Sequence, residues 1–107
     1  MPTKITVIYD NPLDPEAFES AYADGLVGLA QKLPGLVAVE TSKVWAKEDG
    51  SATPAYRMID LYFPDYDTAS AAVTTAEAGA LFPKIFEPAT GGVKILFSDI
   101  EIPLPSA

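Results

Sequence analysis

Two amino acids that carry much of enzyme chemistry are absent from this chain, because its 107 residues include neither histidine nor cysteine. Without an imidazole or a thiol, the chain cannot build a disulfide framework, a thiolate nucleophile, a Ser-His-Asp triad, a histidine-ligated haem or a thiolate zinc site. Carboxylate, phenol, hydroxyl and amine groups remain. The sequence therefore limits any catalysis to these groups, and it predicts neither a metal nor a cofactor.

Positive charge is also scarce, with 7 lysine and arginine residues against 15 aspartate and glutamate residues and a formal net charge of -8. The basic residues are scattered along the chain, which argues against a nucleic-acid partner. No apolar run approaches the roughly 20 residues that a membrane helix needs, and the opening segment lacks a signal-peptide pattern. We therefore expect a soluble, cytoplasmic protein with no membrane partner.

The length predicts one domain over residues 1–107, built around a single hydrophobic core. A domain of about 100 residues buries only about two-thirds of its unfolded surface, so its stability is limited. Apolar residues nevertheless make up 49% of the chain. This apolar content is enough to allow self-association as well as a core.

The first half of the chain predicts a strand, a helix and a second strand. Residues 4–9 are mostly β-branched or aromatic, as in a strand. Asp14 and Pro15 form a helix start, and Pro34 with Gly35 forms a helix stop. Between them apolar residues recur every three or four positions, which predicts one continuous helix with a single buried stripe; the stripe is Phe18, Tyr22, Leu26, Leu29 and Leu33. Residues 36–45 then form the second strand.

The second half of the chain predicts the second strand of a hairpin, then another helix and a last strand. A polar loop leads from residue 45 to a strand over 56–63. Residues 66–82 form a helix with a stripe of small residues, which allows a close approach to a sheet. Pro83 and Pro88 are expected to break the following region into helix and turn. Residues 93–102 form the fourth strand, and residues 103–107 are expected to form an extended arm.

This order of elements predicts an α+β fold of the ferredoxin-like βαββαβ type, with a four-stranded antiparallel sheet and both helices on one face. Alternate side chains of a strand point to opposite faces. In the third strand Ile59, Leu61 and Phe63 share one face, and Tyr56, Met58, Asp60 and Tyr62 share the other. Since both sets are bulky and apolar, the face away from the helices is expected to be a protein interface, a ligand cavity or both.

Four segments make the chain similar to the EthD-like family of the dimeric α+β barrel superfamily. They are the first strand ending at Tyr9 with Pro12 behind it, the segment 29–36 (LAQKLPGL), the segment 61–63 (LYF) and the run 89–97 (ATGGVKILF). The resemblance covers most of the chain. It implies a homodimer in which two subunits stack their sheets face to face, and this arrangement would cover the second apolar face.

The chain departs from the family pattern in its first helix. The family commonly has Tyr-x-x-x-His-x-Pro-Leu-Ala there, with the histidine facing a pocket beneath the sheet. Tyr22 matches, but Leu26 stands at the histidine position and Gly28 at the proline position. Lys84 stands where the family commonly has an acidic residue. Histidine-dependent chemistry of relatives is therefore not carried over to this chain.

Asp60 is the candidate for proton transfer, because it interrupts an apolar strand on the face assigned to the cavity. Apolar surroundings disfavour the charged form and would raise its pKa, which suits general acid–base catalysis. The alternative is a structural carboxylate paired with Arg57, Lys94 or a tyrosine hydroxyl. Glu40 is either a second acid of the pocket or a solvated or cross-strand paired side chain.

Aromatic and apolar side chains supply candidate contacts to a substrate. We expect Tyr22 and Tyr62 to orient it, and Leu26 and Met58 to form an apolar wall. Tyr9 and Phe86 would add aromatic surface. For Tyr9, Tyr22 and Phe86 the alternative is simple core packing.

Two functions follow, and whether the protein is an enzyme stays open. The first is a cofactor-independent homodimer that binds an apolar or aromatic molecule, such as a catabolic or polyketide-like intermediate. It would act by proton transfer, as an isomerase, cyclase, dehydratase or oxygenase. The second is a non-catalytic binding or accessory dimer that lost its chemistry together with the family histidine.

Overall fold

The computed structural model of the chain describes residues 1–102. The elements follow one another as β1 (Thr3–Tyr9), α1 (Pro15–Ala23), α2 (Leu26–Ala30), β2 (Ala38–Lys43), β3 (Arg57–Phe63), α3 (Tyr66–Ala72), α4 (Ala76–Phe86) and β4 (Val93–Asp99). The extended arm predicted for residues 103–107 lies outside the described residues.

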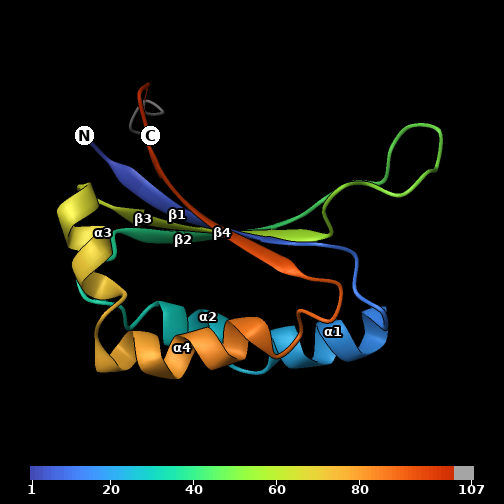
Figure 1. Cartoon of the computed structure of the whole chain (residues 1–107), viewed down its shortest axis with the longest axis horizontal. Helices are drawn as coiled ribbons and strands as arrows, with labels where there is room; N and C mark the ends of the chain where they lie inside the picture. Colours follow the sequence, from blue (N-terminus) through green and yellow to red (C-terminus); the bar gives the residue numbers. More distant parts are fainter. Residues whose placement is uncertain (103–107) are drawn as a thin grey trace.

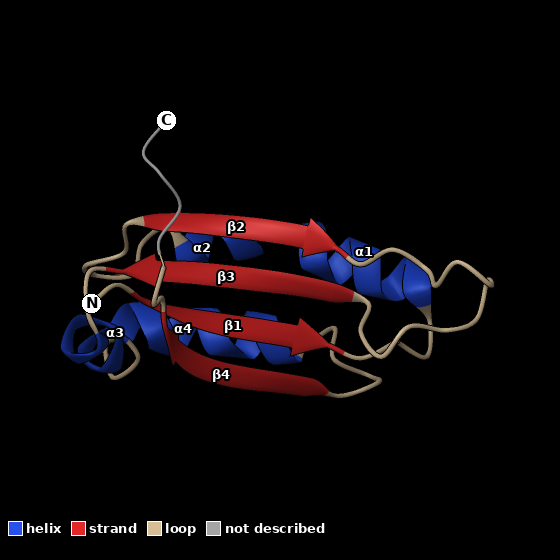
Figure 2. Ribbon diagram, turned by 90° about the horizontal axis from the view of Figure 1, so that it is seen from above, coloured by secondary structure: helices blue, strands red, loops and turns tan. Residues whose placement is uncertain are grey.

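The strands form one sheet in the order β2-β3-β1-β4, and every neighbouring pair is antiparallel. Helices α1 to α4 lie on one side of this sheet (Figure 1). Figure 2 shows the four strands from the opposite side, with α1, α2 and α4 behind them and α3 beside the strand ends. The predicted ferredoxin-like βαββαβ fold is therefore confirmed.

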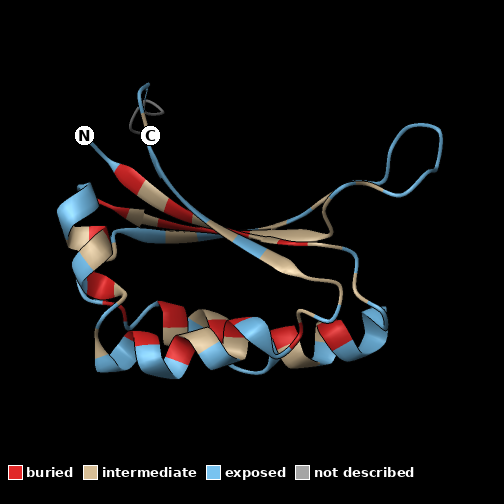
Figure 3. Ribbon diagram, in the orientation of Figure 1, coloured by how far each residue is buried: buried red, intermediate tan, exposed pale blue. Residues whose placement is uncertain are grey.

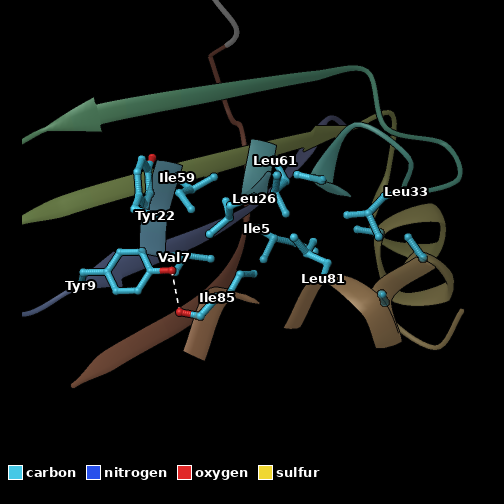
Figure 4. Close-up of a cluster of buried hydrophobic side chains, with 14 of the residues drawn as sticks. Ile5, Val7, Tyr9, Tyr22, Leu26, Leu33, Ile59, Leu61, Leu81 and Ile85 are labelled. Carbon is cyan, nitrogen blue, oxygen red and sulfur yellow. Dashed lines mark hydrogen bonds between the residues drawn. The ribbon is translucent and has the colours of Figure 1, made fainter. Parts of the chain in front are cut away.

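The core fills the space between the sheet and the helices (Figures 3 and 4). Ile5, Val7, Ile59, Leu61 and Phe63 point from β1 and β3 toward the helices, and each is at most 2% exposed. The helices contribute buried residues in return; these are Phe18, Tyr22, Leu26, Leu81 and Ile85. Burying a side chain of this size stabilises the fold by about 1.5–3 kcal/mol. We call this side of the sheet the covered face.

The helices begin at the residues that their capping chemistry favours. The Asp14 carboxylate accepts hydrogen bonds from the backbone N–H groups of Glu16 and Ala17, and Asp65 accepts one from Thr68. These bonds satisfy donors that a helix N-terminus leaves unpaired. The stripe predicted for residues 66–82, Tyr66, Ala69, Val73 and Ala76, is buried only at Ala69 (0% exposed), since Tyr66 and Ala76 are exposed. Ala72 and Ala78 are the other small residues that pack against the core.

The first helix is not continuous, contrary to the sequence-based expectation. Gly25 adopts the left-handed conformation (φ 80°), which ends α1 and precedes the short α2. A residue with a Cβ pays a steric penalty at this φ, whereas glycine does not. The apolar stripe is nevertheless buried as predicted, because the chain resumes its helical path with Leu26 against the core.

The second helical region is two helices, whereas the sequence predicted one helix over residues 66–82. It splits between α3 and α4 at residues 73–75, where the Thr75 hydroxyl caps the new helix by accepting from Ala78 N–H at 3.3 Å. Pro83 does not break the helix, since α4 continues to Phe86. Leu81 and Ile85 on either side of Pro83 are buried in the core, and their burial offsets the cost of a proline inside a helix.

Two strands are shorter than predicted, since β2 ends at Lys43 and β4 ends at Asp99. The chain between β2 and β3 extends well beyond the sheet (Figures 1 and 2). We call residues 44–55 the hairpin arm. Trp45 lies at its base and is 89% exposed, so it contributes nothing to the core.

Candidate functional site

The side of the sheet that faces away from the helices carries a row of polar groups among apolar ones. We call it the open face. Strand alternation and register assign to it Lys4, Thr6 and Ile8 of β1, Ala38, Glu40 and Ser42 of β2, Met58, Asp60 and Tyr62 of β3, and Lys94, Leu96 and Ser98 of β4. Three of the predicted site residues therefore share this face, namely Asp60, Met58 and Tyr62.

Asp60 lies at the centre of the open face and is held by two neighbours. Thr6 is its direct cross-strand partner, and the Thr6 hydroxyl donates a hydrogen bond to Asp60 Oδ1 at 2.6 Å. The Lys4 ammonium lies 3.7 Å from the same oxygen. Asp60 is only 8% exposed, so these two contacts satisfy a carboxylate that is largely removed from water.

Tyr62 and Glu40 form a second polar pair beside Asp60. The Tyr62 hydroxyl donates to Glu40 Oε1 at 2.5 Å, a short charge-assisted bond. This bond, together with burial and the nearby charges of Asp60 and Glu40, raises the pKa of Tyr62 to about 12. The phenol therefore keeps its proton at neutral pH and acts as a hydrogen-bond donor.

A pocket of about 590 Å³ lies at one end of the open face. The chain leaves β4 there, and a hydrogen bond of 2.7 Å from Ile100 N–H to the Pro2 carbonyl holds it at the sheet. The pocket walls are mostly apolar, and its charged or hydroxyl-bearing side chains are Lys4, Glu40 and Tyr62. The full lining is Pro2, Lys4, Val37, Ala38, Glu40, Tyr62, Phe63, Pro64, Ile100 and Ile102. Asp60 and Met58 are on the same face but outside this lining.

The other predicted contacts lie on the covered face. Tyr9 is 0% exposed, and its hydroxyl donates to the Ile85 carbonyl at 2.7 Å (Figure 4). Burial raises the pKa of Tyr9 and of Tyr22. Leu26 is 1% exposed and packs in the same core. Tyr9, Tyr22 and Leu26 are therefore separated by the sheet from Asp60, Met58 and Tyr62, and the six residues do not line one pocket.

Phe86 and Tyr56 also differ from their predicted places. Phe86 is 52% exposed near the end of α4, stacked on Phe82 with 6.2 Å between ring centroids. Tyr56 packs edge-on against Phe18 of α1, on the covered side, because it precedes β3 and does not follow the strand's alternation. Neither ring belongs to the open face.

Lys4 is the residue that sequence reasoning missed. In the sequence it is one of several scattered bases, but the register of β1 and β3 places its ammonium beside Asp60. The alternation of β1 carried the signal, since Lys4, Thr6 and Ile8 share one face. Lys84, at the position that is commonly acidic in relatives, binds Asp24 at 3.2 Å and so ties α4 to the break between α1 and α2.

Within residues 1–102 no group of three or more histidine, cysteine, aspartate or glutamate side chains is arranged to hold a metal ion. Over the same residues, none of the helices combines the length and the apolar character that crossing a membrane requires.

Comparison with known proteins places the chain in a family. No family model matches it. It is 32% identical over 102 residues to an uncharacterised 11.0 kDa protein of Rhodococcus erythropolis encoded in the thcB–thcC intergenic region, and the match covers 95% of this chain and 98% of that one. An EthD family protein of Bacillus halodurans superposes with a TM-score of 0.84 at 23% identity, covering 94% of this chain and 99% of that chain. The chain therefore belongs to the same family as the Rhodococcus protein, and it shares the fold of the EthD family protein.

More distant structures share this EthD-like fold. A dimeric ferredoxin-like protein from Jannaschia has a TM-score of 0.67 at 17% identity, covering 94% of this chain and 100% of that chain. The cofactor-independent oxygenase SnoaB of Streptomyces nogalater has a TM-score of 0.59 at 16% identity, covering 98% and 97%. At these identities the likeness concerns the fold alone.

Proposed function

We propose that this protein with an EthD-like fold is a homodimer that binds an apolar or aromatic small molecule at the end of its open face, without a cofactor. The observation that carries the proposal is the pocket of about 590 Å³, whose apolar walls surround Lys4, Glu40 and Tyr62. Small-molecule sites commonly combine an apolar lining with a few polar groups that orient the ligand. The pocket volume is also in the usual range for such sites.

The homodimer is supported by the uncovered apolar surface of the open face. Leu96 projects from the centre of β4 and is 51% exposed, and Val37 at the pocket is 68% exposed. These two side chains lie at opposite edges of the face, with the polar group of Lys4, Thr6 and Asp60 between them. Apolar side chains exposed on one sheet face favour an interface. Similar folds include a protein described as dimeric. A second copy laid on the open face would remove this surface from water.

Proton transfer is the chemistry that the pocket residues suit best. Glu40 would remove a proton from a carbon beside a carbonyl group and return it to another carbon, so that the substrate isomerises without net oxidation. When the substrate binds, the Tyr62 hydroxyl would turn from Glu40 to the carbonyl oxygen and donate its one proton there, which frees the Glu40 carboxylate to act as the base. The Lys4 ammonium would stabilise the negative charge that develops on that oxygen. Asp60, first considered for the proton transfer itself, would hold Lys4 in place from 3.7 Å.

A second candidate is a binding protein without catalysis. It is favoured by the covered side, where Leu26 stands at the family's histidine position and is 1% exposed in a packed core. Glu40 and Tyr62 would then only orient a ligand.

Two measurements test the dimer and the pocket. Analytical ultracentrifugation of the wild type should give the mass of a dimer, and Leu96→Glu should give a folded monomer because it places a charge in the interface. Nile red should bind the wild type, and Ala38→Glu should abolish binding by placing a charge in the pocket lining. Ala80→Glu makes the same change on the exposed surface of α4, away from both pockets, and should bind the dye normally. A monomeric wild type, or equal dye binding in both variants, refutes the proposal.

Deuterium exchange separates the enzyme from the binding protein. We would incubate the wild type with a panel of aryl ketones and unsaturated lactones in heavy water and follow exchange at carbon by NMR. The enzyme predicts exchange that Glu40→Gln abolishes and that Asp60→Asn only slows. Dye binding without exchange in any variant favours the binding protein.

A further inference from the structure

A second cluster of charges lies on the covered side, at the end of the sheet where the hairpin arm begins. We call Glu19, Lys43, Tyr56 and Arg57 the Glu19 cluster. Lys43 and Arg57 are cross-strand partners on β2 and β3, so both reach the same side of the sheet, toward Glu19 on α1. Neither Glu19 nor this cluster belongs to the pocket of the open face.

The charge balance of the cluster is unusual for this protein. The chain has 15 acidic and 7 basic side chains, yet here two bases share one acid. In the other ion pairs of the described chain, Lys4 and Lys94 each have one carboxylate and Lys84 has two. The Glu19 cluster is therefore a site of local positive charge on a strongly negative protein, and this charge favours an anion.

The donors of the cluster converge on a single carboxylate. Arg57 donates to Glu19 Oε2 from Nε at 3.2 Å and to Oε1 from Nη2 at 3.2 Å. The Tyr56 hydroxyl donates to Oε1 at 2.9 Å, and Lys43 Nζ lies 3.6 Å from Oε1. The Arg57 guanidinium also stacks over the Tyr22 ring at 4.7 Å. Arg57 is thus held by its strand and by stacking and is 19% exposed, whereas the Lys43 and Glu19 side chains are 59% and 36% exposed and can reach a ligand.

A pocket of about 320 Å³ adjoins the cluster on the side of the hairpin arm. Lys43 and Tyr56 belong both to the cluster and to the pocket lining. Asn11 and Val44 line it as well, with residues 50–53 of the arm opposite. The Asn11 side-chain amide donates to the Thr53 carbonyl at 2.8 Å, which fixes the arm against the end of β1. The cluster therefore has an adjacent space for the body of a ligand.

We propose that this pocket is a second binding site, for a small organic monocarboxylate. The ligand's carboxylate would bind the Lys43 ammonium and would accept the hydrogen bond that the Tyr56 hydroxyl gives to Glu19 in the free chain, while Arg57 stays paired with Glu19. One negative charge makes the cluster neutral, so a monoanion fits better than a dianion. The pocket volume suits a body about the size of one aromatic ring. Arg57 and Tyr56 already donate hydrogen bonds to the Glu19 carboxylate. These donors are therefore suited to a carboxylate group.

Isothermal titration of sodium benzoate into the full chain tests this site. We expect saturable binding at one site per chain. Lys43→Gln should weaken it at least about tenfold, because it removes a charged donor. Glu19→Gln should strengthen it several-fold, because it removes the carboxylate that competes for the donors. Lys94→Gln, which removes the same charge from the Asp10 pair on another strand, should bind benzoate like the wild type.

Two further ligands and one optical signal complete the test. Benzyl alcohol, of similar size but neutral, and inorganic phosphate, largely a dianion at pH 8, should both bind at least tenfold more weakly. The only tryptophan, Trp45, precedes Ala46 of the lining, so its emission should change with the same saturation midpoint. Absence of saturable binding refutes the site, as does equal affinity of Lys43→Gln and Lys94→Gln. Lys43 and Glu19 lie outside the open face, and Lys94 lies at the end of that face away from its pocket. The outcome is therefore independent of the dye and dimer experiments.

Discussion

The two faces of the sheet are made by the same strands, yet they differ in almost every physical property. On the covered face Ile5, Val7 and Leu61 are at most 2% exposed and lie among other apolar side chains. One residue along each strand, Lys4, Thr6 and Asp60 form a polar group on the open face. Alternation therefore lets seven-residue strands hold a core on one side and ionisable groups on the other. Stability and chemistry can then change separately, and this separation can be tested.

The largest expected effect comes from truncating a leucine on each face. Leu61→Ala should lower the free energy of unfolding by about 2–5 kcal/mol, because it leaves a cavity in the packed core. Leu96→Ala on the open face should lower it by less than about 1 kcal/mol within one chain, since Leu96 is already half exposed. Urea denaturation monitored by circular dichroism measures both. Equal losses of unfolding free energy in the two variants would show that the covered face does not contribute more to stability than the open face.

Two buried tyrosines on the covered side, Tyr9 and Tyr22, should differ in how much their hydroxyl groups contribute to stability, by less than the two leucines differ. Tyr9→Phe removes the hydroxyl bonded to the Ile85 carbonyl, and it should cost about 1–3 kcal/mol because that buried carbonyl loses its partner. The Tyr22 hydroxyl is buried without a hydrogen-bond partner among the described residues. Tyr22→Phe should therefore change stability by less than about 0.5 kcal/mol, or raise it.

The same denaturation assay measures both tyrosine variants, which differ from the wild type by a single oxygen atom each. A large loss in Tyr22→Phe would mean that its hydroxyl has a stabilising partner after all.

Acid should act through Glu19 at the rim of the covered side. Burial raises the pKa of Glu19, but hydrogen bonds from Arg57 and Tyr56 and the charges of Arg57 and Lys43 outweigh it and lower the pKa below 4.5. A lowered pKa in the folded state gives stability that is present above pH 4.5 and is lost as the pH falls through the folded value. The slope of stability against pH below 4.5 should therefore be smaller in Glu19→Gln than in the wild type. Identical slopes would contradict this assignment.

The smallest effect is spectroscopic and concerns the open face. Tyr62, with a pKa of about 12, should ionise later than an ordinary tyrosine. Phenolate absorbance during an alkaline titration should lose a late component in Tyr62→Phe. In Glu40→Gln the same component should move toward pH 10, because the charged acceptor is gone. If Glu40→Gln leaves the titration unchanged, the bond between the two side chains does not set the pKa.

The fold could be predicted because helix caps and strand alternation are patterns of residues that are close together in the sequence. Asp14 and Asp65 cap helices as expected, and alternation placed Ile59 and Leu61 in the core. The interruptions were missed, since the apolar stripe continues through Gly25 although the backbone does not. In α4 the opposite error occurred, because the burial of Leu81 and Ile85 outweighs the local effect of Pro83.

The candidate site was predictable only in part. Asp60, Met58 and Tyr62 share one face of the sheet, as alternation along β3 predicted, but only Tyr62 lines the pocket. Alternation along β1 also predicts that Tyr9 points to the side opposite Lys4 and Thr6, whereas the side of the sheet on which Tyr22 of α1 lies depends on how the helix packs. The partners of Asp60 depend on the register of β1 against β3. Register joins residues more than 50 positions apart, and no local pattern in the sequence specifies it.

The break at Gly25 bears on whether a histidine could act at position 26, where the EthD-like pattern commonly has one. Leu26 comes directly after the left-handed residue and points into a packed core. An imidazole there would meet hydrocarbon, with neither space for a substrate nor a carboxylate to hold its ring. A single substitution, Leu26→His, would therefore bring a buried polar group and no chemistry. A pocket beneath the sheet would require several core residues to shrink together, so selection is expected to act on the open face instead.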